Sequence, residues 1–173
     1  EYEEFLASFE HEKYQALRLN PLKRDDMSVI TEKVKQTFQL QQVPWAKNGY
    51  YYTKEDQPGK HPWHEAGLYY IQEPSAMAPV TLLSPRPGER ILDLCAAPGG
   101  KSTQIASAME GEGLLVTNEI HSARAKILSE NVERMGIRNA CVLNETPEHL
   151  ADIFEEYFDR ILVDAPCSGE GMF

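Results

Sequence analysis

The sequence has 173 residues, of which 42% are hydrophobic and 25% are charged, a balance typical of one globular domain with a small appendage. No segment approaches the roughly 20 consecutive apolar residues that a membrane-spanning helix needs. The formal net charge is −10, which argues against a protein that binds nucleic acid over its whole surface.

The charge is unevenly distributed along the chain. Residues 1–60 contain 9 Lys and Arg against 10 Asp and Glu, whereas residues 61–173 contain 8 against 17. A polyanion such as RNA would therefore meet the first section with much less repulsion than the second. We expect any RNA contact within this sequence to lie in residues 1–60.

Cysteine usage indicates a protein of a reducing compartment. The three cysteines, Cys95, Cys141 and Cys167, are odd in number and widely spaced, which fits neither a disulfide framework nor a zinc site. The first residues lack the basic start and apolar middle of a signal peptide. We therefore expect a cytoplasmic location, no metal and no membrane partner, while nothing in the sequence indicates an oligomeric state.

The first section predicts a small α+β domain over residues 1–60. Apolar residues at helical spacing indicate a helix within residues 2–15, and a second helix should run from about Asp26 to Phe38. Between them, residues 16–23 alternate leucines with polar residues and read as an extended segment. Residues 43–66 are rich in Pro, Gly and aromatic residues, which predicts loops with a short strand near Tyr50.

The second section, residues 61–173, alternates strand and helix patterns. Strands are expected at 68–72, 90–94, 114–118, 140–143 and 160–163, and helices at 75–83, 101–109, 122–135 and 148–154. This rhythm predicts an α/β fold with a mainly parallel sheet from about Gln72 onward and helices on both faces. Ligands bind such sheets at the carboxyl ends of the strands, here at Leu94, Asn118, Leu143 and Asp164.

The segment Asp93-Leu-Cys-Ala-Ala-Pro-Gly-Gly-Lys-Ser-Thr103 follows a predicted strand and opens a helix. Such a loop brings the backbone close to a ligand, and the helix N-terminus favours an anionic group. One interpretation is a phosphate-binding P-loop, which Gly100-Lys101-Ser102 fits, but Cys95 occupies the position of its first glycine. The other is an S-adenosylmethionine loop, in which Lys101 pairs with the methionine carboxylate.

Glu119 favours the second interpretation. It lies just beyond the next strand, where an acidic residue in nucleoside-binding sheets accepts hydrogen bonds from ribose hydroxyls. A P-loop protein has no need of an acid there. The alternative for Glu119 is a solvated residue at the start of a helix.

A third motif, Asp164-Ala-Pro-Cys-Ser-Gly-Glu-Gly171, follows the apolar strand that ends at Val163. A cysteine here suits methylation of cytosine, because carbon 5 of the ring becomes nucleophilic only after a thiolate adds to carbon 6. The motif therefore predicts that Asp164 and Cys167 belong to a catalytic site. A buried structural cysteine is the alternative for Cys167.

These motifs together closely resemble the Nop/Sun family of RNA 5-methylcytosine methyltransferases, and its RsmF-type ribosomal RNA enzymes in particular. The resemblance covers roughly residues 18–173 and includes Arg18-Leu19-Asn20, the segment 67–75 and Asn118-Glu119. It implies a Rossmann-like S-adenosylmethionine-dependent methyltransferase domain with a small N-terminal α+β domain, acting on RNA and specifically ribosomal RNA.

Site roles carry over from the family by matching its motifs. The resemblance implies that Glu119 binds the ribose and that Asp164 lies beside the methionine end and the target base. It also implies that Thr146 stands where the family has an adenine-binding acid, with Asn144 or Glu145 as substitutes. The expected cofactor loop consists of Cys95, Ala96, Ala97, Pro98, Gly99, Gly100 and Lys101.

The sequence departs from the family at the nucleophile. In the family a second cysteine, in a downstream Thr-Cys motif, attacks the base, and the cysteine matching Cys167 serves product release; no Thr-Cys occurs in these 173 residues. We therefore expect a fragment truncated within the sheet that binds cofactor but transfers no methyl group, with Cys167 as nucleophile the alternative. A P-loop protein and an inert RNA-binding module remain the competing hypotheses.

Overall fold

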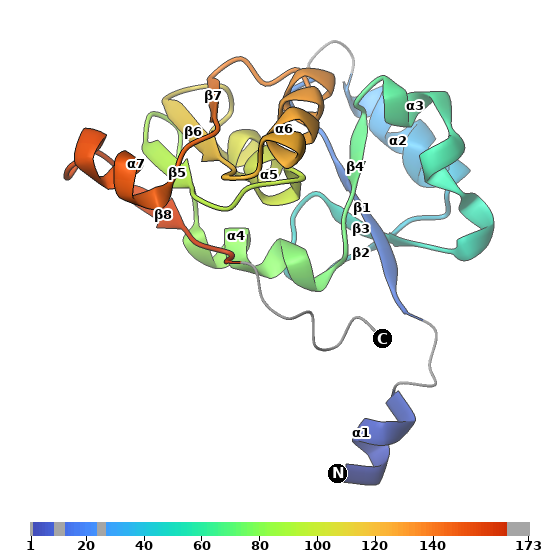
Figure 1. The fold of residues 1–173 in the computed structure, drawn as a ribbon. Coiled ribbons are helices and arrows are strands. Elements are labelled where there is room, and N and C mark those ends of the chain that lie inside the picture. The colour runs from blue at the N-terminus through green and yellow to red at the C-terminus, as the bar shows by residue number, and fades with distance from the viewer. Residues whose placement is uncertain (1, 9–12, 24–26, 166–173) are drawn as a thin grey trace.

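The computed structural model describes residues 2–8, 13–23 and 27–165, which form two four-stranded sheets (Figure 1). The first sheet is antiparallel, with the strand order β2-β3-β1-β4. Its strands are β1 (Gln15–Leu19), β2 (Gln41–Gln42), β3 (Gly49–Tyr52) and β4 (Tyr69–Ile71). The second sheet is parallel, with the order β7-β6-β5-β8. Its strands are β5 (Arg90–Asp93), β6 (Leu114–Asn118), β7 (Ala140–Leu143) and β8 (Arg160–Leu162).

The helices follow the expected rhythm. In the first half they are α1 (Tyr2–Ser8), α2 (Met27–Thr37), the 3₁₀ turns η1 (Lys54–Asp56) and η2 (Pro58–Lys60), and α3 (Pro62–Glu65). In the second half they are η3 (Ser75–Met77), α4 (Ala78–Leu83), α5 (Gly100–Ala108), α6 (Ser122–Arg134) and α7 (Pro147–Ile153). The predicted α/β class with a parallel sheet is confirmed, and each of its strands lies within one residue of its expected bounds.

The strand expected at 68–72 belongs to the first sheet. Strand β4 pairs with β1 in antiparallel register, Leu17 opposite Ile71 and Leu19 opposite Tyr69. The N-terminal unit therefore extends beyond the boundary expected at residue 60. Local composition placed the boundary within the loop-rich segment 43–66, whereas the pairing of β4 depends on contacts with residues about fifty positions earlier.

Five layers follow one another across the molecule. Figure 1 shows α7 on one side of the parallel sheet and α4, α5 and α6 on the other, with the antiparallel sheet beyond these helices and α2 and α3 outermost. The middle layer of helices is thus covered by a sheet on each side, which explains why α5 is buried along most of its length.

Strand β1 links two of these interfaces by alternation. Leu17 and Leu19 point to the core with α2, where they pack with Val34, Phe38 and Tyr69. Arg18 and Asn20 point the other way, toward α5 and the end of α6. Because both faces of β1 are covered, the four residues from Ala16 to Leu19 are all buried.

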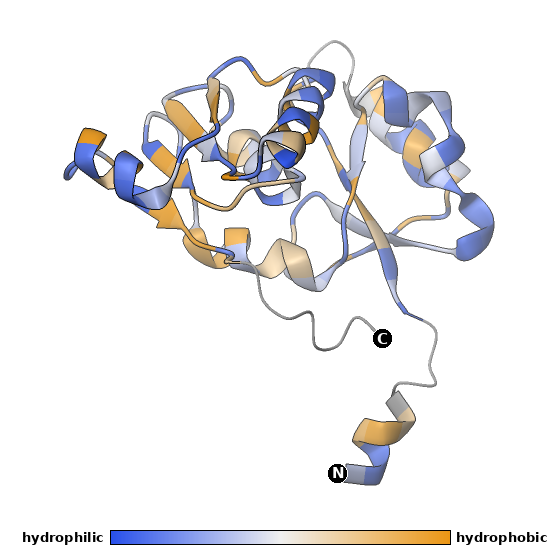
Figure 2. Ribbon diagram, viewed as in Figure 1, coloured by the Kyte–Doolittle hydropathy of each residue, from blue (hydrophilic) through white to orange (hydrophobic). Residues whose placement is uncertain are grey.

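The parallel sheet has a main core on the side of α4 and α5. Its members come from strands and helices alike: Val80, Ile91, Ile105, Ala106, Met109, Leu115 and Leu162. Figure 2 shows hydrophobic residues along these strands. On the opposite face Leu92 and Val116 are buried, whereas Ile161 of the edge strand β8 is 53% exposed.

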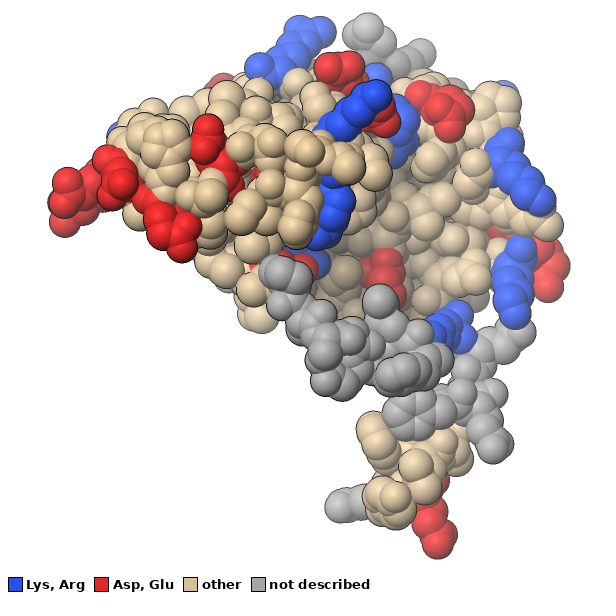
Figure 3. Space-filling view, viewed as in Figure 1, with Lys and Arg blue, Asp and Glu red and all other residues tan. Residues whose placement is uncertain are grey.

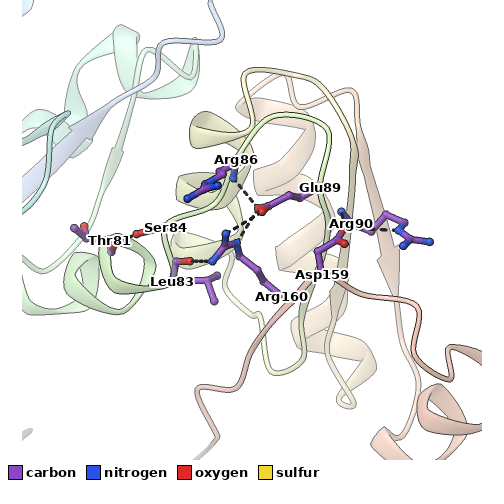
Figure 4. Close-up of polar contacts among 8 residues, drawn as sticks. All are labelled: Thr81, Leu83, Ser84, Arg86, Glu89, Arg90, Asp159 and Arg160. Carbon is purple, nitrogen blue, oxygen red and sulfur yellow. Dashed lines mark hydrogen bonds and ion pairs between the residues drawn. The ribbon is translucent and has the colours of Figure 1, made fainter.

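A polar network at the amino edge of this sheet fixes the start of β8 (Figure 4). The Arg160 guanidinium donates to both carboxylate oxygens of Glu89, at 2.8 and 2.9 Å, and to the Leu83 carbonyl at 2.9 Å. The Arg90 amide donates to the Asp159 carboxylate at 2.7 Å. These contacts tie β8 to the end of α4 and the start of β5, so they set the register that brings Asp164 to the opposite edge.

Candidate functional site

Every sequence-predicted site residue within the described part of the chain lies at the carboxyl edge of the parallel sheet. The loop 94–99 follows β5, Glu119 follows β6, residues 144–146 follow β7 and Asp164 follows β8. The strands run parallel, so their carboxyl ends meet at one edge and the four segments become neighbours.

Asn118 holds three of these segments together. Its side-chain amide donates to the Leu94 carbonyl at 3.2 Å and to the Glu145 carbonyl at 3.0 Å, and its oxygen accepts from the Glu145 amide at 3.0 Å. Its own carbonyl accepts from the Ala96 amide at 2.8 Å. Asn118 is 1% exposed, so these bonds form away from water and set the loop geometry.

The cofactor-loop candidates form a tight turn into α5. Ala96 and Ala97 are buried, and Gly99 adopts φ +112°, a left-handed conformation that disfavours side chains. A Cβ on Gly100 would stand 3.3 Å from the Tyr70 ring and 3.5 Å from the Gln72 amide nitrogen. The turn therefore lies against β4 and the residue that follows it, so the N-terminal unit forms one wall beside the turn.

Glu119 is 3% exposed, and both of its carboxylate oxygens are engaged. One accepts from the His121 amide at 3.0 Å and the other lies 3.4 Å from the Arg124 guanidinium. Arg124 also donates to the Ala97 carbonyl at 2.8 Å. This bridge fixes the position of the Glu119 carboxylate relative to the loop after β5.

Lys101 and Asp164 form an ion pair of 2.6 Å across the site, and Lys101 keeps 18% of its side chain exposed. An ammonium group has three donors, so this lysine can hold Asp164 and still donate to a ligand carboxylate. The pair joins the first turn of α5 to the end of β8.

Asp93 is a site residue that sequence reasoning did not single out. It is fully buried, one carboxylate oxygen accepts from the Ser102 hydroxyl at 2.7 Å, and the other has no hydrogen-bond partner among the described residues. Burial raises the pKa of Asp93 to about 6, against the opposing effects of Ser102 and Lys101. An orphaned buried oxygen beside Lys101 suits a ligand that brings its own donor.

Thr146 caps the N-terminus of α7, its hydroxyl accepting from the His149 amide at 3.3 Å. Its neighbour Asn144 donates to the carbonyls of Glu119 and Ile120, at 2.7 and 2.9 Å. The Glu145 carboxylate pairs with His149 at 2.8 Å. The segment expected near adenine is therefore held beside Glu119, and each of its three polar side chains has a protein partner.

The cysteines differ in their surroundings. Burial, followed by the negative charges of Glu119, Asp93 and Asp164, raises the pKa of Cys95, so its thiol stays protonated at neutral pH. Cys141 is exposed on β7. Cys167, the predicted catalytic cysteine, lies outside the described residues.

Two further site residues, Asn118 and Arg124, received no separate role from the sequence. A strand-ending asparagine next to an expected ribose acid was the available signal for Asn118. For Arg124, about one helical turn beyond Glu119, the sequence favoured a surface residue, with closure over the cofactor as the alternative. Within the described ranges, no group of three His, Cys, Asp or Glu could hold a metal ion, and no helix is long and apolar enough to cross a membrane.

Comparison with known sequences agrees with this geometry. The family of 16S rRNA methyltransferases RsmB/F matches residues 80–173, and the N-terminal domain of 16S rRNA methyltransferase RsmF matches residues 1–74. The chain belongs to the RsmB/F family. S-adenosyl-L-methionine is the cofactor of this family. The two matched regions meet between residues 74 and 80, just after β4 completes the antiparallel sheet.

Individual relatives carry the same family name. The chain is 40% identical over 176 residues to ribosomal RNA small subunit methyltransferase F of Aeromonas hydrophila, and 38% identical over 174 residues to that of Vibrio parahaemolyticus. In each case the match covers 98% of this chain. It spans 37% and 36% of the two relatives, so the chain is similar to about a third of their length.

Solved structures show the same fold. A methyltransferase homolog protein from Pyrococcus horikoshii superposes with a TM-score of 0.83 at 34% identity, covering 95% of this chain and 54% of that one. NSun6 from the same organism, solved with SFG, gives a TM-score of 0.76 at 19% identity, covering 90% of this chain and 63% of that one. The second likeness supports the fold alone.

Proposed function

We propose that this protein transfers a methyl group from S-adenosyl-L-methionine to carbon 5 of a cytosine in RNA, with 16S ribosomal RNA as the substrate. One observation carries the proposal: the loop 95–101, Glu119 and the Lys101–Asp164 pair converge at one edge of the parallel sheet. Membership of the RsmB/F family supports the RNA class.

The residues present fit the cofactor at both of its ends. In our proposal Glu119 accepts from the ribose hydroxyls, Lys101 donates to the methionine carboxylate, and the orphaned Asp93 oxygen faces the α-ammonium group. Thr146, with Asn144, borders the adenine. When bound, the cofactor supplies an electrophilic methyl group, and Asp164 stands where the target base would meet it.

Binding of S-adenosylmethionine against ATP separates this proposal from a P-loop protein. Calorimetry should show saturable binding of S-adenosylmethionine and no measurable binding of ATP with magnesium, because Cys95 holds the position of the first P-loop glycine. Tighter binding of ATP would overturn the proposal. A protein that bound RNA but not S-adenosylmethionine would instead fit the inert RNA-binding module.

The attack of a cysteine on carbon 6 of the cytosine is tested through Cys167 in the full-length protein. Following the family resemblance, we propose that another cysteine attacks the base and that Cys167 serves release of the product. Cys167→Ala should then trap a covalent protein–RNA adduct, visible on a denaturing gel with labelled RNA, because attack proceeds and elimination stalls. Loss of the adduct in this variant would make Cys167 the nucleophile.

We propose that the protein acts in the cytoplasm and that the N-terminal unit contacts the RNA. Figure 3 shows acidic residues around α7, whereas basic and acidic residues are interspersed over the N-terminal unit on this face. Two exposed aromatic residues lie close in sequence to lysines of this unit. Tyr14, next to Lys13, is 79% exposed, and Trp45, two residues before Lys47, is 42% exposed. Aromatic faces beside cations suit unpaired RNA bases. Arg18 takes no part in this surface, because it is buried.

A further inference from the structure

Arg18 crosses from the N-terminal unit to the helix that carries the cofactor loop. Its Nε donates to the Gln72 side-chain oxygen at 3.1 Å. One terminal nitrogen donates to the Thr103 carbonyl and the Ser107 hydroxyl, at 3.4 and 3.2 Å. The other donates to the Gly100 carbonyl and the Thr103 hydroxyl, at 3.3 and 2.6 Å. All five N–H groups of the guanidinium are therefore used, and four of them act on α5.

The partners of Arg18 leave its charge uncompensated. Every acceptor is neutral, and the described residues place no carboxylate against it, only the Tyr70 ring at 6.0 Å. Arg18 is 2% exposed, and burial lowers its pKa to about 9, which keeps it charged at neutral pH. A buried cation without an anion is costly, and a neutral polar side chain could hold some of these acceptors without that cost. Hydrogen bonding alone therefore does not explain why a charged residue occupies this position.

The position of the charge suggests that function. Gly100 and Thr103 form the first turn of α5, whose N-terminal amides already carry a partial positive charge. The other cation on this turn, Lys101, is paired with Asp164. Two further carboxylates, Asp93 and Glu119, lie at the same edge of the sheet, and of these Glu119 is paired with Arg124. An anionic ligand group would be repelled here unless additional positive charge lay beneath the turn.

We propose that Arg18 is a positioning residue for the carboxylate of the cofactor, because it fixes the first turn of α5 and places a buried positive charge under it. This inference rests on the proposed function, since it takes S-adenosylmethionine as the ligand. It also makes the N-terminal unit part of the scaffold of the cofactor site, in addition to any contact with RNA.

Two ligands that differ at one end test the inference in the full-length protein. S-adenosylhomocysteine contains the amino-acid carboxylate, whereas 5′-methylthioadenosine keeps the adenosine and the sulfur but lacks that end. In Arg18→Met, the affinity for S-adenosylhomocysteine measured by calorimetry should fall by about tenfold or more, while that for methylthioadenosine stays within about threefold. Ser107→Ala, which removes one acceptor of Arg18 and no charge, should keep the wild-type ratio of the two affinities.

An equal loss of affinity for both ligands would overturn the inference, because a general loss of structure weakens binding of both ends of the cofactor alike. No loss of affinity for either ligand would overturn it as well. Arg18→Lys keeps the charge but not the five-donor geometry. Arg18→Lys should therefore show a smaller selective loss of affinity for S-adenosylhomocysteine. If Arg18→Met has no cooperative melting transition, the ratio of the two ligand affinities in Arg18→Lys tests the inference instead. Failure of the wild-type protein to bind either ligand would refute the proposed function instead.

Discussion

The carboxyl group of Asp93 lies at the end of β5, where one oxygen accepts from Ser102 and the other has no partner in the part of the chain that the structure describes. A residue with this environment opposes folding when it is ionised. Such a destabilising buried carboxylate is typical of a ligand-binding site, and the neighbouring Lys101 and Asp164 belong to the same site.

Asp93 should make the stability of the unliganded protein depend on pH. Its folded pKa of about 6 lies above the unfolded value of 3.8, so the folded state binds the proton more tightly. The destabilisation is absent below pH 4, grows as the pH rises to 6 and is complete above it. At pH 8 Asp93→Asn should therefore raise the free energy of unfolding by roughly 1–3 kcal/mol. Urea unfolding at pH 8 and pH 4.5 checks this; an unchanged or lowered stability at pH 8 would contradict it.

Glu119 allows a prediction on ligand affinity. Glu119→Ala removes the acceptor expected for the ribose hydroxyls in a nearly closed site, so S-adenosylmethionine should bind about 1–3 kcal/mol more weakly. Isothermal calorimetry measures the change. Glu130→Ala, an exposed acid on α6, is the matched control and should bind as the wild type does. Unaltered affinity in Glu119→Ala would remove this residue from the site.

At the scale of elements, the N-terminal unit packs closely against the C-terminal end of α6. Asn20 donates to the carbonyls of Gly67 and Met135, both at 2.8 Å. Gly67 has φ +70°, and a Cβ there would stand 2.1 Å from the Arg134 carbonyl oxygen. The end of α6 can reach the loop before β4 only because residue 67 has no side chain.

Gly67→Ala should therefore destabilise the protein more than backbone strain alone can. Gly88 offers the matched control, since its φ of +82° imposes the same strain but no atom lies within 4 Å of an added Cβ. We expect Gly88→Ala to cost about 1 kcal/mol and Gly67→Ala about 2–4 kcal/mol, because the clash separates two packed elements. Thermal unfolding of both variants tests the difference. Equal melting temperatures would show that the contact between residue 67 and the end of α6 accommodates a Cβ without loss of stability.

At the scale of the molecule, the two units share a layer of helices. Helix α5 contacts the parallel sheet on one side and Arg18 of the antiparallel sheet on the other, and its first turn belongs to the candidate cofactor site. The family comparison treats the two parts as separate regions, 1–74 and 80–173. Their interface nevertheless contains buried polar contacts that neither region can satisfy alone.

We predict that residues 1–173 by themselves transfer no methyl group. The family resemblance assigns the attack on carbon 6 to a Thr-Cys cysteine, and these residues contain no such motif. Incubation with labelled S-adenosylmethionine and 16S rRNA should give no labelled RNA above background, while the full-length protein labels it. Transfer by residues 1–173 alone would make Cys167 sufficient as the nucleophile.

The sequence alone determined the parallel sheet and the position of its ligand edge. Strand and helix periods are local properties, and the loop 95–101, Glu119 and Asp164 each follow a strand at a spacing that the sequence displays. It could not assign β4 to the antiparallel sheet, because that pairing joins Leu17 to Ile71 across a long stretch of chain.

Only the tertiary structure decided the roles of Arg18, Asp93 and Arg124. Each depends on burial or on partners far away in sequence. Arg18 contacts Thr103, Arg124 contacts Ala97, and Asp93 is buried with a single hydrogen-bond partner among the described residues. An arginine in a strand reads locally as a surface cation. It becomes a buried one here because β1 is covered on both faces, and no local pattern encodes which helix covers it.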